Sequence, residues 1–240
     1  MKTSILTFFV LLSFSISGVE AQEEVPPSSF IVNLSLDNAF GFNPSVYGSF
    51  GIAPQLSLSY YGIFWTNPAF GTLIDGTDAW LELGLGVGYT ILDNRLSFNP
   101  FVGITNGRLL SDSPRGALAE GLVPGLGILF KDQRFEGEFN LSYYKAIKNE
   151  GLDSGDYLLY WFLPGVAIHR NISLGLHYES FILTRINRGD SGTQYEWLGA
   201  YLKFTVGDRY AFRFSAGANT AKNGIYSDQF YKLTVVIPML

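Results

Sequence analysis

The sequence predicts an all-β fold, a closed antiparallel transmembrane β-barrel of about twelve strands. Segment after segment alternates apolar with polar or small residues, as strands do when their two faces meet different surroundings. Aromatic residues make up 16% of the chain and charged residues only 15%, which is too little charge to cover a surface that faces water. The connections between the segments alternate between short and long, which is typical of a barrel that crosses a membrane.

The chain opens with the features of a secretory signal peptide. Lys2 supplies a positive charge, residues 5–16 form an apolar run, and Val19 and Ala21 are small side chains at the positions that a signal peptidase reads. We therefore expect residues 1–21 to be cleaved, residues 22–29 to form a short flexible segment, and residues 30–240 to form the barrel. The chain has no cysteine, so a lipoprotein anchor, disulfides and thiolate metal sites are excluded.

The alternation of side chains predicts where the strands lie. In the clearest segment, Leu81, Leu83 and Leu85 share one face and the residues between them share the other. Some prolines fall inside predicted strands, and because proline removes a donor from the ladder, bulges or local kinks are expected at Pro100, Pro124, Pro164 and Pro238. The predicted strands are 30–37, 46–52, 56–65, 80–92, 95–105, 119–130, 134–144, 157–168, 172–183, 195–206, 210–219 and 229–239.

The predicted connections differ in length between the two ends of the barrel. Tight turns are expected at 53–55, 93–94, 131–133, 169–171 and 207–209. Longer polar loops are expected at 38–45, 66–79, 106–118, 145–156, 184–194 and 220–228. This pattern predicts short periplasmic turns and longer extracellular loops. An even number of strands places both ends of the barrel on the periplasmic side.

The signal peptide, the alternation and the unequal loops together resemble those of bacterial outer-membrane β-barrels over the whole mature chain. Residues 40–67, reading FGFNPSVYGSFGIAPQLSLSYYGIFWTN, resemble the opening hairpin of a family of predicted outer-membrane barrels with no assigned function. The resemblance implies a bacterial outer-membrane location, contact with outer-membrane lipid, and passage through the export and barrel-assembly machinery. The net charge of -5 argues against nucleic acid as a partner.

Strand parity predicts which charged side chains face the lumen. Carboxylates fall on the fourth, seventh and ninth predicted strands and cations on the tenth to twelfth, so an acidic arc is followed by a basic arc. The arcs fit two interpretations: internal ion pairs, because each buried charge needs a partner, or a transverse field across a water-filled pore. His177 and Glu179 are adjacent inward positions and should lie within reach of each other. The predicted charged lining is Glu82, Glu136, Glu138, His177, Glu179, Lys203, Arg213 and Lys232.

Small and large side chains divide the predicted lumen into two walls. One wall carries the aromatic residues Tyr144, Trp161, Trp197 and Tyr201. Because glycine weakens a strand unless something approaches the backbone closely, a solute, a folded-in loop or residues 23–29 are candidates to occupy the space beside the other wall. That wall is predicted to carry Gly84, Gly86, Gly88, Gly103, Gly125 and Gly127.

The predicted size permits a narrow pore. Barrels of about eight strands are filled by side chains, whereas barrels of about sixteen leave an open channel. We therefore expect a narrow passive channel or a binding barrel for small polar solutes, with no cofactor, metal site or catalytic residue. Two alternatives are an outer-membrane lipid hydrolase or acyltransferase, for which no marked nucleophile and base are found, and a structural barrel that binds a partner through its extracellular loops.

Overall fold

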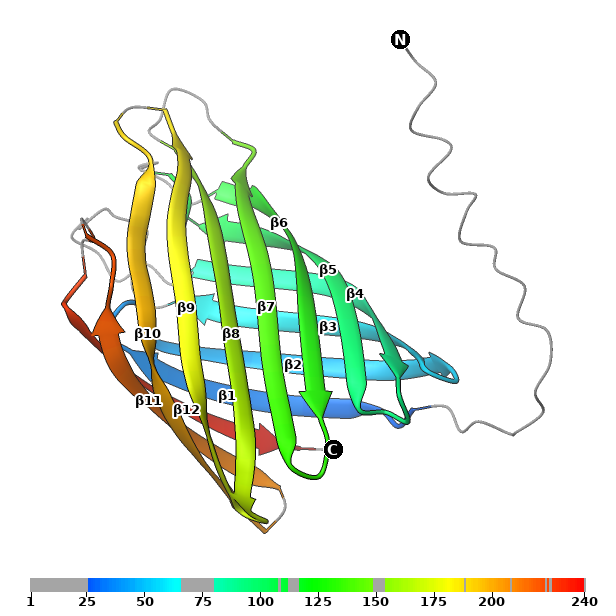
Figure 1. The fold of residues 1–240 in the computed structure, drawn as a ribbon. Coiled ribbons are helices and arrows are strands. Elements are labelled where there is room, and N and C mark those ends of the chain that lie inside the picture. The colour runs from blue at the N-terminus through cyan, green and yellow to red at the C-terminus, as the bar shows by residue number, and fades with distance from the viewer. Residues whose placement is uncertain are drawn as a thin grey trace.

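The protein, described here by a computed structural model, is a closed barrel of antiparallel strands (Figure 1). The structure describes residues 26–65, 80–107, 109–111, 117–148, 154–187, 189–207, 209–222, 224 and 226–239. The strands are β1 (Ser29–Asp37), β2 (Gly41–Ala53), β3 (Leu56–Trp65), β4 (Trp80–Ile91), β5 (Leu96–Gly107), β6 (Ala117–Lys131), β7 (Phe135–Ala146), β8 (Gly155–His169), β9 (Ile172–Ile186), β10 (Gly192–Val206), β11 (Tyr210–Asn219) and β12 (Gln229–Pro238). Each strand pairs with its neighbours in sequence, and β1 pairs with β12 to close the ring. Within the described ranges, no helix is long and apolar enough to cross a membrane.

The alternation of side chains separates an apolar outer surface from a polar interior, as the sequence predicts. On β4, Leu83, Leu85 and Val87 are exposed on the outside, with Leu85 at 62%, while Glu82 is buried at 1%. Successive side chains of a strand point to opposite faces, so the same parity runs along the whole strand. The outer face of the barrel is therefore the lipid-facing surface of a transmembrane β-barrel.

An arginine should be tolerated much less on the outer face than on the inner face. Leu85→Arg should lower the free energy of unfolding by about 2–4 kcal/mol, because its charge would sit in lipid near the middle of the strand. Gly127→Arg is the control, since Gly127 lines the interior cavity and a Cβ there has nothing closer than 3.8 Å. Urea unfolding in lipid vesicles measures both changes. Equal losses at the two positions would contradict the assignment of the faces.

The first connection is shorter than the sequence predicts. Residues 38–45 are expected to form a loop, but β2 already begins at Gly41, so only residues 38–40 turn. The Asp37 carboxylate explains the difference, because its Oδ1 accepts hydrogen bonds from the backbone amides of Ala39, at 3.0 Å, and Phe40, at 2.6 Å. Gly41 then takes a left-handed φ of 65° that favours glycine.

The other described connections keep the predicted contrast in length. We call the end with the tight turns the short-turn end and the opposite end the long-loop end. Both Ser29 and Pro238 lie at the short-turn end, as an even strand number requires. Ser29, predicted to precede the barrel, is the first residue of β1. The predicted signal peptide 1–21, the loop 66–79 and residues 112–116 and 149–153 of two other loops lie outside the described residues.

Of the bulges or local kinks expected at the prolines, the bulges are wrong for Pro100, Pro124 and Pro164, because these residues interrupt one ladder each without shifting its register. Past Pro100, pairing between β4 and β5 resumes in the same register, and the same holds at Pro124 and Pro164. Pro238 is the last residue of β12. Each of the three interior prolines therefore loses pairs toward one neighbouring strand only. The lost donor is accommodated locally, whereas the register shifts of the described ladders lie elsewhere, for example between Thr105 and Gly107.

Candidate functional site

Large side chains fill the barrel interior at the long-loop end. Phe40, at the turn between β1 and β2, packs edge-on against Trp65 of β3, at 5.0 Å between ring centroids, and against Phe181 of β9, at 5.7 Å. Strands β3 and β9 lie on opposite sides of the twelve-strand ring. These ring contacts therefore cross the lumen. We call the cluster the aromatic plug, and it comprises Ala39, Phe40, Trp65, Trp80, Leu109, Leu110, Val123, Tyr144, Ala146, Tyr157, Leu159, Phe181, Leu183, Tyr195, Trp197 and Phe230.

Stacked rings extend the plug along β10 and β12. Trp197 lies between Tyr195, at 4.2 Å, and Phe230, at 4.8 Å, with its ring nearly parallel to both. Such aromatic pairs contribute roughly 0.5–1.5 kcal/mol each beyond the area they bury. Trp197, predicted to line the lumen, is thus 0% exposed inside the plug. Tyr144, from the same predicted set, also belongs to the plug but borders the cavity described below.

A buried carboxylate that the sequence interpretation missed holds part of the plug in place. Glu120 accepts hydrogen bonds from the amides of Leu109, at 2.8 Å, and Leu110, at 3.1 Å, and from the Ser111 hydroxyl, at 2.6 Å. Strict parity places Glu120 on the outer face of β6. A φ of 52° at Ala119, beside the irregular pairing of β5 and β6, turns it inward. A lone glutamate among apolar outward positions was the available signal.

A cavity of about 480 Å³ lies between the plug and the short-turn end, a size within the range of pockets that bind small molecules. It extends to the ends of the strands, because Ser29, Ser57 and Ser97 line it near the starts of β1, β3 and β5. Hydroxyl and amide side chains dominate the wall of β1 to β5, with Ser35, Ser45, Ser49, Ser59, Asn33, Asn43 and Asn99 among the lining residues. The wall can therefore both donate and accept hydrogen bonds.

The glycines predicted to line the lumen have two kinds of neighbour. Gly88 and Gly127 line the cavity. The others are covered by side chains of nearby strands: the Tyr61 ring lies over Gly84 and Gly103, the Phe101 ring over Gly125, and the Ser59 hydroxyl against Gly86. Side chains of the barrel strands therefore occupy the space beside these four glycines.

The predicted basic and acidic arcs are joined by ion pairs along one wall. Lys203 pairs with Glu136, and Arg213 pairs with Glu138 at 2.7 Å. Both pairs bridge from β7 to β10 and β11. Long side chains can reach across because the intervening strands carry small residues. The predicted lining residue Tyr201 lies over two of these, Gly165 and Gly175. Its hydroxyl donates a hydrogen bond to Glu136 at 2.8 Å. Trp161 donates to Glu138 at 2.8 Å. The arrangement matches the ion-pair interpretation.

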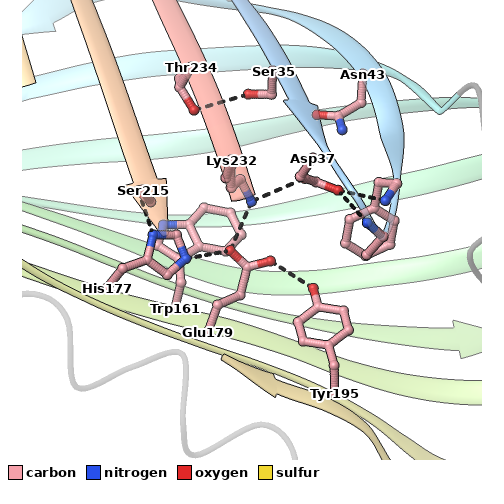
Figure 2. A network of polar contacts seen from close by, with 12 residues as sticks. Ser35, Asp37, Asn43, Trp161, His177, Glu179, Tyr195, Ser215, Lys232 and Thr234 are labelled. Atoms are coloured by element: carbon pink, nitrogen blue, oxygen red, sulfur yellow. Dashed lines mark hydrogen bonds and ion pairs between the residues drawn. The ribbon is translucent and has the colours of Figure 1, made fainter. Parts of the chain in front are cut away.

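Figure 2 shows a second network, in which Lys232 lies between Asp37 and Glu179. The Lys232 ammonium is 2.8 Å from Glu179 Oε2 and 3.6 Å from Asp37 Oδ2. Glu179 also accepts hydrogen bonds from Tyr195, at 2.7 Å, and contacts His177 Nε2 at 3.2 Å, so the expected contact between His177 and Glu179 is present. Asp37 is a further lumenal carboxylate, to which the sequence interpretation assigned no role.

His177 links Glu179 to a serine in an arrangement that superficially resembles a hydrolase triad. Its Nδ1 is 3.0 Å from the hydroxyl of Ser215, a residue that sequence reasoning did not single out. A nucleophile must reach a substrate as well as a base. Ser215 is only 1% exposed and does not border the cavity. The contact therefore satisfies buried polar groups and gives no support to an enzyme.

Glu82 differs from the other lumenal charges because its partners are neutral. Its carboxylate accepts hydrogen bonds from the Tyr61 hydroxyl, at 2.8 Å, and from the Trp65 indole and the Tyr144 hydroxyl, both at 3.1 Å. Among the described residues, no cation lies within ion-pair distance of it. The same part of the chain contains no cluster of His, Asp and Glu side chains suited to a metal ion.

The closed ring of strands and its apolar outer surface define a transmembrane β-barrel. It is similar in fold to the NanC porin, with a TM-score of 0.53, 8% sequence identity, and coverage of 87% of this chain and 98% of the porin. It is also similar to an outer-membrane channel from Pseudomonas putida F1, with a TM-score of 0.54, 11% identity, and coverage of 93% and 100%. No curated protein matches the chain in sequence.

A family model matches residues 1–239. The chain belongs to this family, which is described as a family of unknown function (DUF6733).

Proposed function

We propose that this protein is an outer-membrane barrel that admits small polar solutes to its lumen from the periplasmic side, with onward passage limited by the aromatic plug. The observation that carries the proposal is the cavity that extends to the short-turn end, is lined in part by hydroxyl, amide and charged side chains, and is backed by ring contacts crossing the lumen. The likeness in fold to outer-membrane channels supports it. Hydrophobic constrictions can restrict a pore by excluding water, so the lumen acts as a binding barrel or a narrow, restricted channel.

Thiol accessibility tests whether solutes enter the cavity and stop at the plug. The chain has no cysteine, so every thiol is an introduced one. With the barrel in lipid nanodiscs, Ser57→Cys should react with 2-aminoethyl methanethiosulfonate, because Ser57 lines the cavity. Val123→Cys should not react, because Val123 is 0% exposed within the plug. Intact-protein mass spectrometry measures both rates, and Gln133→Cys in an exposed turn serves as the reactive reference.

Each outcome of this labelling bears on the proposal. An unreactive Ser57→Cys beside a reactive Gln133→Cys would show a lumen closed to solutes and overturn the function. A Val123→Cys that reacts as fast as Ser57→Cys would show that water fills the plug, and the barrel would then be an open pore. The alternative of partner binding through the extracellular loops rests largely on residues 66–79, 112–116 and 149–153, which lie outside the described part of the chain.

A further inference from the structure

We propose that the end of the cavity next to the aromatic plug is a binding site for a small organic ammonium ion. Asp37 and Glu82 would hold the ion against the rings of Phe40 and Trp65. This inference rests on the proposed function, because the ligand must first enter the lumen. It adds the charge and chemical class of the solute.

The count of charges along the cavity leaves an excess of carboxylates. Four acidic side chains line it, Asp37, Glu82, Glu138 and Glu179, against two strongly basic ones, Arg213 and Lys232. Arg213 is committed to Glu138 at 2.7 Å, and Lys232 lies closest to Glu179 at 2.8 Å. Asp37 therefore shares Lys232 only at the longer distance of 3.6 Å, and among the described residues Glu82 has no cation within ion-pair distance. An ionisable residue inside a membrane span is costly and marks a site of function when no partner offsets it.

Asp37 is one of the two carboxylates that lack close compensation. Its side chain is fully buried, and its Oδ1 is occupied by the amides of the turn. Asp37 lines the cavity, and its buried Oδ2 receives no hydrogen bond and has the Lys232 ammonium at 3.6 Å, beyond hydrogen-bond range. A buried oxygen with an unused lone pair favours a donor group on the ligand.

Glu82 is the second such carboxylate, and an aromatic pair connects it to the first. Its three neutral donors occupy three of its approximately four acceptor positions. One of those donors is the Trp65 indole, whose ring is 5.0 Å from the Phe40 ring, and the Phe40 amide binds Asp37. The two carboxylates thus flank one pair of rings. Aromatic faces attract desolvated ammonium groups.

This combination selects an organic cation over the other solute classes. An anion would be repelled by the excess of carboxylates, because like charges are weakly screened in a barrel surrounded by lipid. A bare metal ion would need a cluster of ligands, and none occurs among the described residues. A neutral polyol could bond to the serine and asparagine wall but would leave both carboxylates uncompensated. A small ammonium ion satisfies the carboxylates and the rings together.

Three ligands of nearly the same shape test the charge requirement. They are choline, its neutral carbon isostere 3,3-dimethylbutan-1-ol, and the anion 3,3-dimethylbutanoate. Isothermal titration calorimetry on the full-length barrel in nanodiscs should give saturable binding of choline. The alcohol and the anion should bind at least about tenfold more weakly, because they cannot pair with a buried carboxylate. Equal binding of choline and the alcohol would overturn the inference, and so would tighter binding of the anion.

Matched variants locate the site. Glu82→Gln keeps the size and acceptor oxygen of the side chain but removes its charge, and should weaken choline binding about tenfold. Asp37→Asn should act in the same direction. Phe212→Ala, on the lipid-facing surface and outside the cavity, should leave choline binding unchanged. Heat-modified gel mobility shows which variants fold, and Glu82→Gln remains informative if the turn at Asp37 tolerates no change.

The failures of the inference and of the proposed function are distinguishable. If none of the three ligands binds while Ser57→Cys still reacts with the thiol reagent, the lumen admits solutes and only the ammonium site is wrong. If choline binds equally to the native barrel and to folded Glu82→Gln and Asp37→Asn, binding occurs elsewhere and the site is wrong. If Ser57→Cys does not react, the proposed function fails first.

Discussion

A barrel without the rings of Phe40 and Trp197 should conduct ions across a planar bilayer in steps that the native barrel lacks. Phe40 bridges the opposite strands β3 and β9, and Trp197 joins the stacks on β10 and β12. Replacing both with alanine removes the contacts that cross the lumen and allows water to enter the plug. Because ions follow water through a hydrophobic constriction, conductance should rise from near zero. Single-channel recording on the Phe40→Ala/Trp197→Ala double variant measures it.

Loss of buried rings also lowers stability, so the comparison needs a matched control. Each ring removed from a packed interior costs about 3–5 kcal/mol, and the double variant must first be shown to be folded by its gel mobility. Phe162→Ala/Phe212→Ala removes two rings from the lipid-facing surface, where Phe162 and Phe212 are exposed. This control should remain non-conducting. Native steps as large as those of the plug variant, or a folded plug variant that stays silent, would show that the plug is not the barrier.

The second large effect is expected at Lys232. Lys232→Met keeps the length of the side chain but leaves Glu179 and Asp37 buried without their shared cation. Breaking a buried ion pair by removing one partner costs about 3–5 kcal/mol, so the free energy of unfolding should fall by that amount. Urea unfolding in vesicles measures the loss. An unchanged stability would mean that the carboxylates find another counter-charge in the native lumen.

A compensating substitution separates charge from packing in this experiment. In Lys232→Met/Glu179→Gln the closer carboxylate is neutral, and most of the lost stability should return. The control combines Lys203→Met with the same Glu179→Gln change. Lys203 pairs with Glu136 and not with Glu179. This control should show no recovery. Recovery in both combinations would mean that Glu179→Gln stabilises the barrel independently of Lys232.

The fold was largely predictable because strand parity is a local property of the sequence. Alternation along residues 80–92 is enough to assign the two faces of β4, and the same holds for the other strands. The exceptions arise where a side chain overrides the local pattern. Asp37 shortens the first connection by binding the turn amides. At the prolines, pairs are missing toward one neighbouring strand, but the register continues and no extra residue is inserted.

The candidate site was less predictable because its contacts depend on the order of strands around the ring. Parity predicts that Glu136 and Lys203 point inward, but their pairing spans two intervening strands, whose Gly165 and Gly175 lie beneath Tyr201. The plug as a cluster was not predicted, although two of its residues, Tyr144 and Trp197, were assigned to the lumen. Phe40 was assigned to a loop, and Glu120 has the wrong parity unless the irregularity at Ala119 is known. For Glu120 the local signal was a lone charge among apolar outward positions, whereas no local pattern indicates the contacts of Phe40.

The plug also has a bearing on how the barrel is assembled. Phe40 is presented by the first hairpin, whereas the rings that it meets on β9 and β10, and the Phe230 stack beyond them, come from the second half of the chain. Lys232 of the last strand forms an ion pair with Asp37 of the first strand. A chain that folds from its N-terminus therefore keeps a hydrated lumen until the seam between β1 and β12 closes. Water therefore leaves the plug in the same cooperative step in which β1 pairs with β12. A partly assembled barrel has neither a dry plug nor a paired β1 and β12.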